Sequence, residues 1–513
     1  MPFLERHNRS LAVALVLLAS ARIVATYAVF NHTVDEPGHI ACGMEWLDKG
    51  TYRYFPEQPP LARVAAALGP YLLGIRSQGS PKHDLMPVTY EGVSILYRDH
   101  HYDLTLALAR LGILPFFWVA CGVVWVWGKR AYGPVVAIVA VFLFSFLPPV
   151  LAHAGLATTD MALAAFLGAA FLAAMIWVEQ PGMARAAWFG LCTGLAVLAK
   201  FSSLAFFPAA VAVALAWFVL AERPKVAALA KAATTRAPSF AVALAVGLAV
   251  IWIGYRFSLV DLFQGIRDLI KHNAAGHPDY LLGARSQSGF WDFYFVVLAV
   301  KTPLALLLLL AAAKRPRGAR ILPLAFAGGI LLVAVFSSIN IGVRHILPVY
   351  IGLSIVAADG TRRMWEQRWA RIPVVVLLVW FAASSLASHP DYLPYFNELA
   401  GDAPEKILVD SDLDWGQDMK RLGRRLQEVG AREVTFKPLV LADFERALGF
   451  PRVLPMDPAA PSPGWNAVSL TWWKTRRFGW GEAHPEVPVW PERMPPGERI
   501  GKGTMLWYFP PGR

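Results

Sequence analysis

The stretch DEPGHIACGMEWLDKGTYRYFPEQPPLARV, residues 35–64, directly follows an apolar run that is long enough to cross a membrane. Two neighbouring acids, Asp35 and Glu36, stand where the chain leaves that run. In a helix, adjacent side chains point about 100° apart, so these two acids could not face one partner equally. One acid could face a reacting group while the other stabilises the surrounding structure. The alternative is a pair of solvated acids in a loop.

The whole chain has the composition of a polytopic membrane protein. Of its 513 residues, 56% are hydrophobic and 16% are charged, whereas soluble domains carry about 25% charged residues. The formal net charge of +12 comes from short basic clusters between apolar runs, which is typical of cytoplasmic loops and argues against nucleic-acid binding. Cys42, Cys121 and Cys192 lack the spacing of metal ligands and do not indicate a disulfide framework.

Apolar runs predict about eleven transmembrane helices, since a helix needs about 20 apolar residues to cross the hydrocarbon core. A signal peptide is the alternative for the first run, but that run continues to Phe30, so we expect a retained span. The run 187–220 is too long for one helix and is divided at AKFSS. The predicted spans are 10–30, 104–127, 135–151, 161–178, 187–199, 203–220, 238–256, 293–313, 321–338, 346–358 and 372–388.

The distribution of charge predicts the orientation. With the N-terminus in the cytoplasm, every inside loop holds Lys or Arg, and most of the acids fall outside. Residues 1–388 then form the membrane domain, with large outer loops at 31–103 and 257–292. Residues 389–513 form a small mixed α/β extracytoplasmic domain, indicated by a helical pattern at 416–429 and the strand-like EVTFKPLVL at 433–441.

Further charged residues gather at the outer ends of the spans. Asp160 begins one span, and a second outer-face acid suits an enzyme, because a carboxylate can accept a hydroxyl proton. A first-turn Asp stabilised by the helix dipole is the alternative. Charged residues at membrane depth are costly, so the cations there are candidates for a functional role, such as neutralising a phosphate leaving group. The alternative is that their side chains simply extend to the membrane interface. These cations are Lys200, Arg256, Lys301 and Arg344.

Two outer loops offer further candidates, for which an ordinary loop is the alternative. Arg63 follows a rigid Pro-Pro turn, and AGHPDYLLGARS (275–286) holds His277, Tyr280 and Arg285, any of which could border a binding cavity. The tail segment DSDLDWGQD (410–418) imitates the start of a calcium loop. Its glycine comes one place late and position 12 is Arg421, so we expect a structural or acceptor-side role instead.

These segments, in this order, resemble the GT-C superfamily of lipid-carrier-dependent glycosyltransferases. The branch most similar contains the protein O-mannosyltransferases and the lipid A aminoarabinose transferases. The matching segments run from residue 35 to about 422, and the most specific is DE followed by PPL some twenty residues later. The resemblance implies a GT-C-type α-helical membrane fold. It departs at Gln58, where relatives usually have His or Lys, and in the tail, which lacks the β-trefoil insertion of the O-mannosyltransferases.

The resemblance also implies an activity. The protein would be an inverting glycosyltransferase that moves a sugar, such as a hexose, from a polyprenyl phosphate to a hydroxyl acceptor on a protein, lipid or glycan. Asp35 would be the general base, and Glu36 and Asp160 would orient it or the acceptor. The candidates for binding the carrier phosphate are Arg63, Lys200, Lys301 and Arg344.

No cofactor is expected, and a divalent metal is possible but not expected. The expected location is a bacterial inner membrane, with membrane lipids around the spans and the active site on the periplasmic side. A transporter or flippase of the lipid-linked sugar is the alternative, although such proteins often show inverted repeats, which are not evident here.

Overall fold

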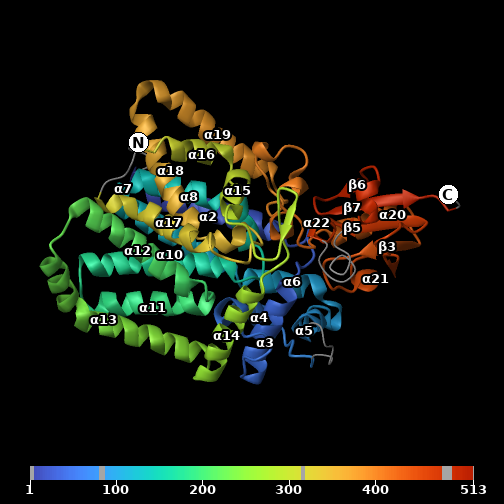
Figure 1. The fold of residues 1–513 in the computed structure, drawn as a ribbon, viewed down its shortest axis with the longest axis horizontal. Coiled ribbons are helices and arrows are strands. Elements are labelled where there is room, and N and C mark those ends of the chain that lie inside the picture. Colours follow the sequence, from blue (N-terminus) through green and yellow to red (C-terminus); the bar gives the residue numbers. More distant parts are fainter. Residues whose placement is uncertain (1–4, 80–86, 314–317, 476–487, 512–513) are drawn as a thin grey trace.

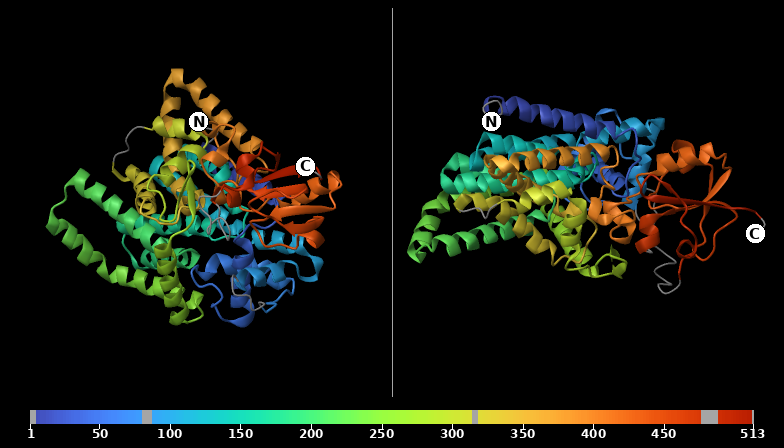
Figure 2. Two further views of the ribbon diagram at one scale, coloured as in Figure 1. Left: turned by 45° about the vertical axis from the view of Figure 1, so that its right-hand side comes forward. Right: turned by 90° about the horizontal axis from the view of Figure 1, so that it is seen from above.

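The computed structural model describes the chain except residues 1–4, 80–86, 314–317, 476–487 and 512–513. Long helices run side by side along the longest dimension, and a small sheet lies beyond one end of them (Figures 1 and 2). Most of the buried apolar side chains belong to one core that runs through the helices and continues beneath the sheet.

Six helical segments in the described residues are long and apolar enough to cross a membrane. The protein is therefore an integral membrane protein. These segments are α2 (Asn8–Ala25), α6 (Tyr102–Leu111) with α7 (Leu114–Tyr132), α10 (Asp160–Glu179), α12 (Ser203–Glu222), α13 (Val226–Gly254), and η5 (Arg368–Ala370) with α19 (Arg371–Ala387).

Two predicted spans are bent pairs of helices instead of straight segments, and counting each pair as one span gives up to eight. The first pair, α8 (Pro134–Ser145) and α9 (Pro148–Ala154), is bent by 67°. The second, α15 (Phe293–Lys301) and α16 (Leu304–Ala311), is bent by 108°. Both bends come where a proline follows the first helix, and proline cannot continue the hydrogen bonding of a helix.

The other three predicted spans are also helical, in α11 (Met183–Ala199), α17 (Leu322–Ala334) and α18 (Val349–Glu366). The predicted division at AKFSS is present, because Lys200 is extended between α11 and α12. All eleven predicted ranges thus coincide with helices, whereas the number of membrane crossings stays a prediction.

The first outer loop folds into α3 (Glu36–Met44), the π-helical turn η1 (Glu45–Lys49), α4 (Pro60–Leu72), α5 (Pro87–Leu96) and the 3-10 turn η2 (Arg98–His100). Two glycines allow the first three α-helices to pack closely. A Cβ at Gly43 would lie 1.9 Å from the Arg63 carbonyl oxygen, and one at Gly92 would lie 1.9 Å from that of Pro37. Helix α5 therefore packs against the start of α3, where the two acids stand, and α4 packs against its end.

The second outer loop contains α14 (Leu259–Ala275) and an antiparallel hairpin of β1 (Asp279–Leu281) and β2 (Ala284–Ser286). Short 3-10 turns flank α17: η3 (Gly318–Ile321) precedes it and η4 (Val343–Ile346) follows it. The hairpin contacts the tail through the Leu282 amide, which donates to the Ile407 carbonyl at 2.9 Å. Both outer loops and the tail lie toward the same end of the helices (Figure 1).

The tail holds a five-stranded sheet, which confirms the predicted mixed α/β character. Its strands are β3 (Glu433–Lys437), β4 (Arg452–Pro455), β5 (Gly464–Ser469), β6 (Glu498–Ile500) and β7 (Thr504–Phe509), in the order β4-β3-β5-β7-β6. Strand β3 runs parallel to β4 and β5, and the remaining pairs are antiparallel. The helices of the tail are α20 (Met419–Glu428), α21 (Phe444–Ala447) and α22 (Leu470–Thr475). The tail also contains the 3-10 turns η6 (Glu398–Ala400), η7 (Pro404–Lys406), η8 (Asp410–Asp412) and η9 (Trp490–Arg493).

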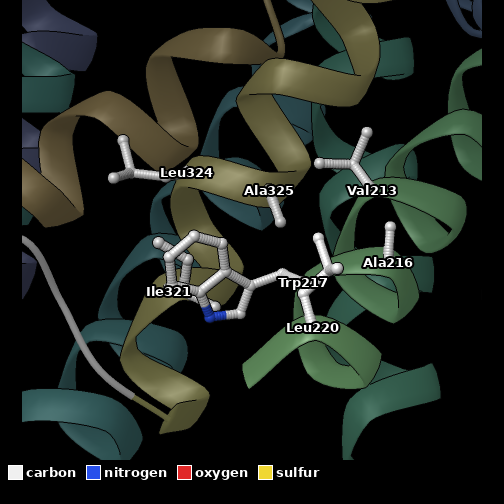
Figure 3. Close-up of a pocket in the computed structure, with 7 residues that line it drawn as sticks. All are labelled: Val213, Ala216, Trp217, Leu220, Ile321, Leu324 and Ala325. Atoms are coloured by element: carbon white, nitrogen blue, oxygen red, sulfur yellow. The ribbon is translucent and has the colours of Figure 1, made fainter. Parts of the chain in front are cut away.

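An apolar hollow of about 340 Å³ lies between α12 and the start of α17 (Figure 3). Trp217 and Leu220 line it from α12, and Ile321 and Leu324 line it from the facing segment. It has no titratable side chain in its lining and lies toward the far end of α12 from Lys200. The hollow is therefore separate from the charged residues considered next.

Candidate active site

Asp35 precedes the first turn of α3 and pairs with Arg344 of η4. Its Oδ2 accepts a hydrogen bond from Arg344 Nη1 at 2.7 Å, and its side chain is 34% exposed. Burial raises the pKa of Asp35, but the Arg344 guanidinium outweighs it and holds that pKa below its usual value. Asp35 is thus an ionised carboxylate that solvent or a substrate can still reach.

Glu36 has completely different surroundings. Its carboxylate is fully buried and accepts two hydrogen bonds of 2.8 Å from Arg110. It also accepts bonds from the amide and hydroxyl of Thr33 and from the Ala157 amide. Burial raises the pKa of Glu36, and these donors, Arg110 above all, bring it below its usual value. Glu36 therefore ties the start of α3 to α6 and to the turn before α10.

Asp160 begins α10 and is paired with Lys200. Its Oδ1 accepts a hydrogen bond from Lys200 Nζ at 2.7 Å, whereas Oδ2 is buried and has no partner among the described residues. Lys200 is in position because the chain is extended between α11 and α12. A buried carboxylate oxygen without a donor is costly, so Asp160 Oδ2 is an unsatisfied acceptor.

The two acids Asp35 and Asp160 come together around Arg344. Burial lowers the pKa of the Arg344 guanidinium, but the carboxylates of both acids raise it above its usual value. Arg344 is itself only 6% exposed, and its Nε is buried without an acceptor in the part of the chain that the structure describes. The cluster therefore contains a buried cation with unused capacity to bind an anion.

Arg63 and Lys301, two other predicted phosphate ligands, donate hydrogen bonds to protein groups. Arg63 is 1% exposed and donates to His39 Nδ1, the Tyr52 hydroxyl and the carbonyls of Phe55 and Gln58. Lys301, also 1% exposed, donates to the carbonyls of Leu393 at 2.8 Å and Asp412 at 2.5 Å. Both hold loops in place here, and phosphate binding by them stays a prediction.

Two of the three candidates of the second outer loop, Tyr280 and Arg285, contact the tail. His277 Nδ1 is 3.0 Å from Asp279 Oδ1, and both residues are buried. The Tyr280 hydroxyl donates to the Lys406 carbonyl at 3.5 Å, and Arg285 Nε donates to the Lys474 carbonyl at 2.6 Å. The structure thus places Tyr280 and Arg285 against the tail and not beside Asp35, and their role at a cavity stays a prediction.

The tail segment 410–418 reaches the cluster, and Trp415 makes the central contacts. Its ring lies 4.1 Å from the Arg344 guanidinium, and its carbonyl accepts from the Val34 amide at 3.1 Å. Trp415 therefore contacts Arg344 and the residue before Asp35. The tail completes the surroundings of this ion pair.

The acids of this segment have protein partners. Asp412 Oδ1 accepts from the Val343 amide at 3.0 Å. The Asp414 carboxylate accepts from the Ser469 hydroxyl and the Thr471 amide, and burial raises its pKa to about 6. No group of three or more potential metal-binding side chains occurs among the residues that the structure describes. The contacts agree with a structural role for the segment.

Sequence reasoning missed three residues of this site: Arg110, His39 and Trp415. Arg110 had a signal, because it is an ionisable residue within a predicted span. His39 also had one, since it lies one helical turn after Asp35. Trp415 had none, because its contact with Arg344 depends on how the tail docks.

Comparisons with known proteins bear on the fold. No protein-family model matches the chain, and no curated protein matches its sequence. A solved structure of ArnT from Cupriavidus metallidurans bound to undecaprenyl phosphate is similar, with 13% identity and a TM-score of 0.54. The apo state of that protein gives 15% and 0.50, and both comparisons cover 96% of this chain and 97% of the other. The chain therefore shares its fold with these ArnT structures over nearly its whole length, in agreement with the helical membrane fold that the resemblance implies.

Proposed function

We propose that this protein is an inverting glycosyltransferase that moves a sugar from a polyprenyl phosphate to a hydroxyl acceptor at the outer face of the membrane. The observation that carries the proposal is the pair of Asp35 and Arg344. A carboxylate open to a substrate stands beside a buried guanidinium whose Nε has no acceptor among the described residues. This combination provides a base and an anion-binding group in contact with each other.

Asp35 accepts the proton of the attacking hydroxyl in this mechanism. Arg344 depresses the pKa of Asp35 in the substrate-free protein and so makes it a weak base. When the guanidinium binds the donor phosphate, Asp35 loses part of its counter-charge, and its pKa rises toward that of a better base. Binding of the donor thus prepares Asp35 for proton transfer.

Arg344 then stabilises the negative charge that develops on the departing phosphate. Lys200 supplies a second positive charge nearby, and it is held there by Asp160. The unpartnered Asp160 Oδ2 accepts a hydrogen bond from a hydroxyl of the sugar or of the acceptor. In this proposal, side-chain cations neutralise the phosphate, so the step needs no metal ion.

The fold supports a lipid-linked donor. ArnT from Cupriavidus metallidurans, which has this fold, is described in complex with undecaprenyl phosphate. The bond between the anomeric carbon and the phosphate oxygen breaks as the hydroxyl attacks from the opposite side, and the configuration inverts. The same reaction can serve a protein, lipid or glycan acceptor, because Asp35 requires only a hydroxyl proton.

The test is transfer of label from radiolabelled polyprenyl-phosphate hexoses in membranes that contain wild type, Asp35→Asn or Asp103→Asn. Asp103 is a matched control, since it lies in the same outer loop and is 75% exposed. We expect transfer with wild type and Asp103→Asn only. Full activity of Asp35→Asn would refute the assigned base. Movement of intact labelled lipid across the bilayer, without transfer, would favour a transporter.

A further inference from the structure

His39 lies one turn after Asp35 on the same side of α3. Its amide donates to the Asp35 carbonyl at 3.1 Å, which extends the helical turn back to Asp35. Residues four apart in a helix lie on one face, so the imidazole and the Asp35 carboxylate are neighbours. The ring is largely buried, with 7% of the residue exposed.

The partner of His39 fixes where its proton lies. Arg63 Nε is 3.0 Å from His39 Nδ1. A guanidinium N–H can only donate, and arginine keeps its charge in proteins, so Nδ1 must accept with its lone pair. The single N–H of the neutral ring is therefore at Nε2. Burial and the Arg63 charge lower the pKa of His39 to about 3, which keeps the ring neutral at physiological pH.

The Nε2–H is available to a substrate. No acceptor for it occurs among the described residues, although the Nδ1 side of the ring is fully engaged. Nε2 also keeps some solvent-accessible surface, although the residue as a whole is largely buried. A fixed, neutral N–H donor that solvent can contact thus lies beside Asp35.

We propose that His39 Nε2 donates a hydrogen bond to the acceptor hydroxyl while Asp35 receives the proton of that hydroxyl. This inference rests on the proposed glycosyl transfer. Arg344 and Lys200 supply the positive charges for the leaving phosphate. We therefore assign the uncharged His39 donor to the attacking oxygen, which is neutral before its proton moves to Asp35.

The hydroxyl has one proton and two lone pairs, which gives each neighbour a distinct place. The proton points to Asp35, one lone pair accepts from His39 Nε2, and the other is directed at the anomeric carbon. As the new carbon–oxygen bond forms, the bond to the phosphate oxygen breaks and its electron pair leaves with the phosphate. His39 keeps its proton throughout and positions the nucleophile.

Two substitutions distinguish the proposed hydrogen bond from Nε2 to the hydroxyl from the hydrogen bond that Nδ1 accepts from Arg63. The oxygen of Asn can occupy the place of Nδ1 and still accept from Arg63, but it puts no donor at the place of Nε2. The amide nitrogen of Gln can occupy the place of Nε2 and restores the donor. We expect His39→Asn to lower transfer roughly ten- to hundredfold, the effect of one lost hydrogen bond, and His39→Gln to retain more activity.

The experiment measures label transfer from polyprenyl-phosphate hexose and, separately, binding of undecaprenyl phosphate to each full-length variant. For His39→Asn we expect transfer to be lost while binding of undecaprenyl phosphate stays within about twofold of wild type. The lost hydrogen bond is one to the attacking hydroxyl, and the binding site of the lipid phosphate is left intact. Normal transfer by His39→Asn, greater activity of Asn than of Gln, or an equal loss of binding and transfer would overturn the inference. If His39→Gln misfolds, the comparison of His39→Asn with wild type decides. Absence of transfer by wild type would instead overturn the proposed function.

Discussion

Replacing Glu36 by Gln is expected to destabilise the protein strongly, although the two side chains have nearly the same shape. The Glu36 carboxylate accepts five hydrogen bonds, two at Oε1 and three at Oε2. An amide nitrogen cannot accept, so it would oppose at least two of these donors and leave the buried Arg110 without its counter-charge. Breaking a buried ion pair in this way costs about 3–5 kcal/mol, which corresponds to a fall of roughly 3–5 °C in Tm for a chain of 513 residues.

The three cysteines provide the assay. Cys42, Cys121 and Cys192 are free and buried, so a fluorogenic thiol reagent in detergent reports the unfolding of the purified protein. The double variant Glu36→Gln with Arg110→Met should recover at least half of the loss in Tm, because it removes the buried, unpaired charge of Arg110. A Tm for Glu36→Gln within 1 °C of wild type, or no recovery in the double variant, would refute this reasoning.

Three other predictions follow from the same contacts. Because the pKa of Glu36 is depressed on folding, its contribution to stability is complete above its unfolded value of about 4.3 and is lost as pH falls through the lower folded value. The buried neutral His39 lowers the Tm of wild type and of Glu36→Gln alike at pH values below its unfolded pKa of about 6.5, so the difference in Tm between the two proteins is the measurement; that difference should be constant from about pH 7 to 5 and shrink only at the acid end, and a smaller difference already at pH 6 would contradict this. Asp160→Asn should reduce label transfer less completely than Asp35→Asn, which should abolish it while the protein stays folded in the membrane; the reverse order would exchange their roles. Trp415→Ala should lower transfer about tenfold through loss of the contact with Arg344, whereas Trp415→Phe should retain most of it, because an aromatic face attracts a guanidinium; equal rates for the two variants would argue against this contact.

The helices could be predicted from the sequence because membrane spans are set by local composition. The division at AKFSS could be predicted for the same reason, since the apolar run around it was too long for one helix. The bends after Lys301 and before Pro148 were not predicted, although prolines mark both places. The helix α13 begins at Val226, earlier than the predicted start at 238, and it continues through Pro238.

The site was harder to predict from the sequence, because charge and position identify candidate residues but not their partners. The sequence singled out Asp35, Asp160 and Arg344, which come together in the structure. It could not show that Arg63 is held by His39 and the Pro-Pro loop, or that Arg285 turns toward the tail. The Arg285 contact joins residues 189 positions apart, and the Arg63 contact joins residues of two separate helices, so tertiary packing determines both.

The position of Trp415 between Val34 and Arg344 has a consequence for biosynthesis. A ribosome inserts the membrane helices in order, and Arg344 is in place well before residue 415 emerges. The ion pair with Asp35 can then form, but its support from the tail arrives only when the last fifth of the chain has been translated and folded. A truncated chain would therefore enter the bilayer with the Asp35–Arg344 pair incompletely surrounded, so that incomplete products would lack a finished site.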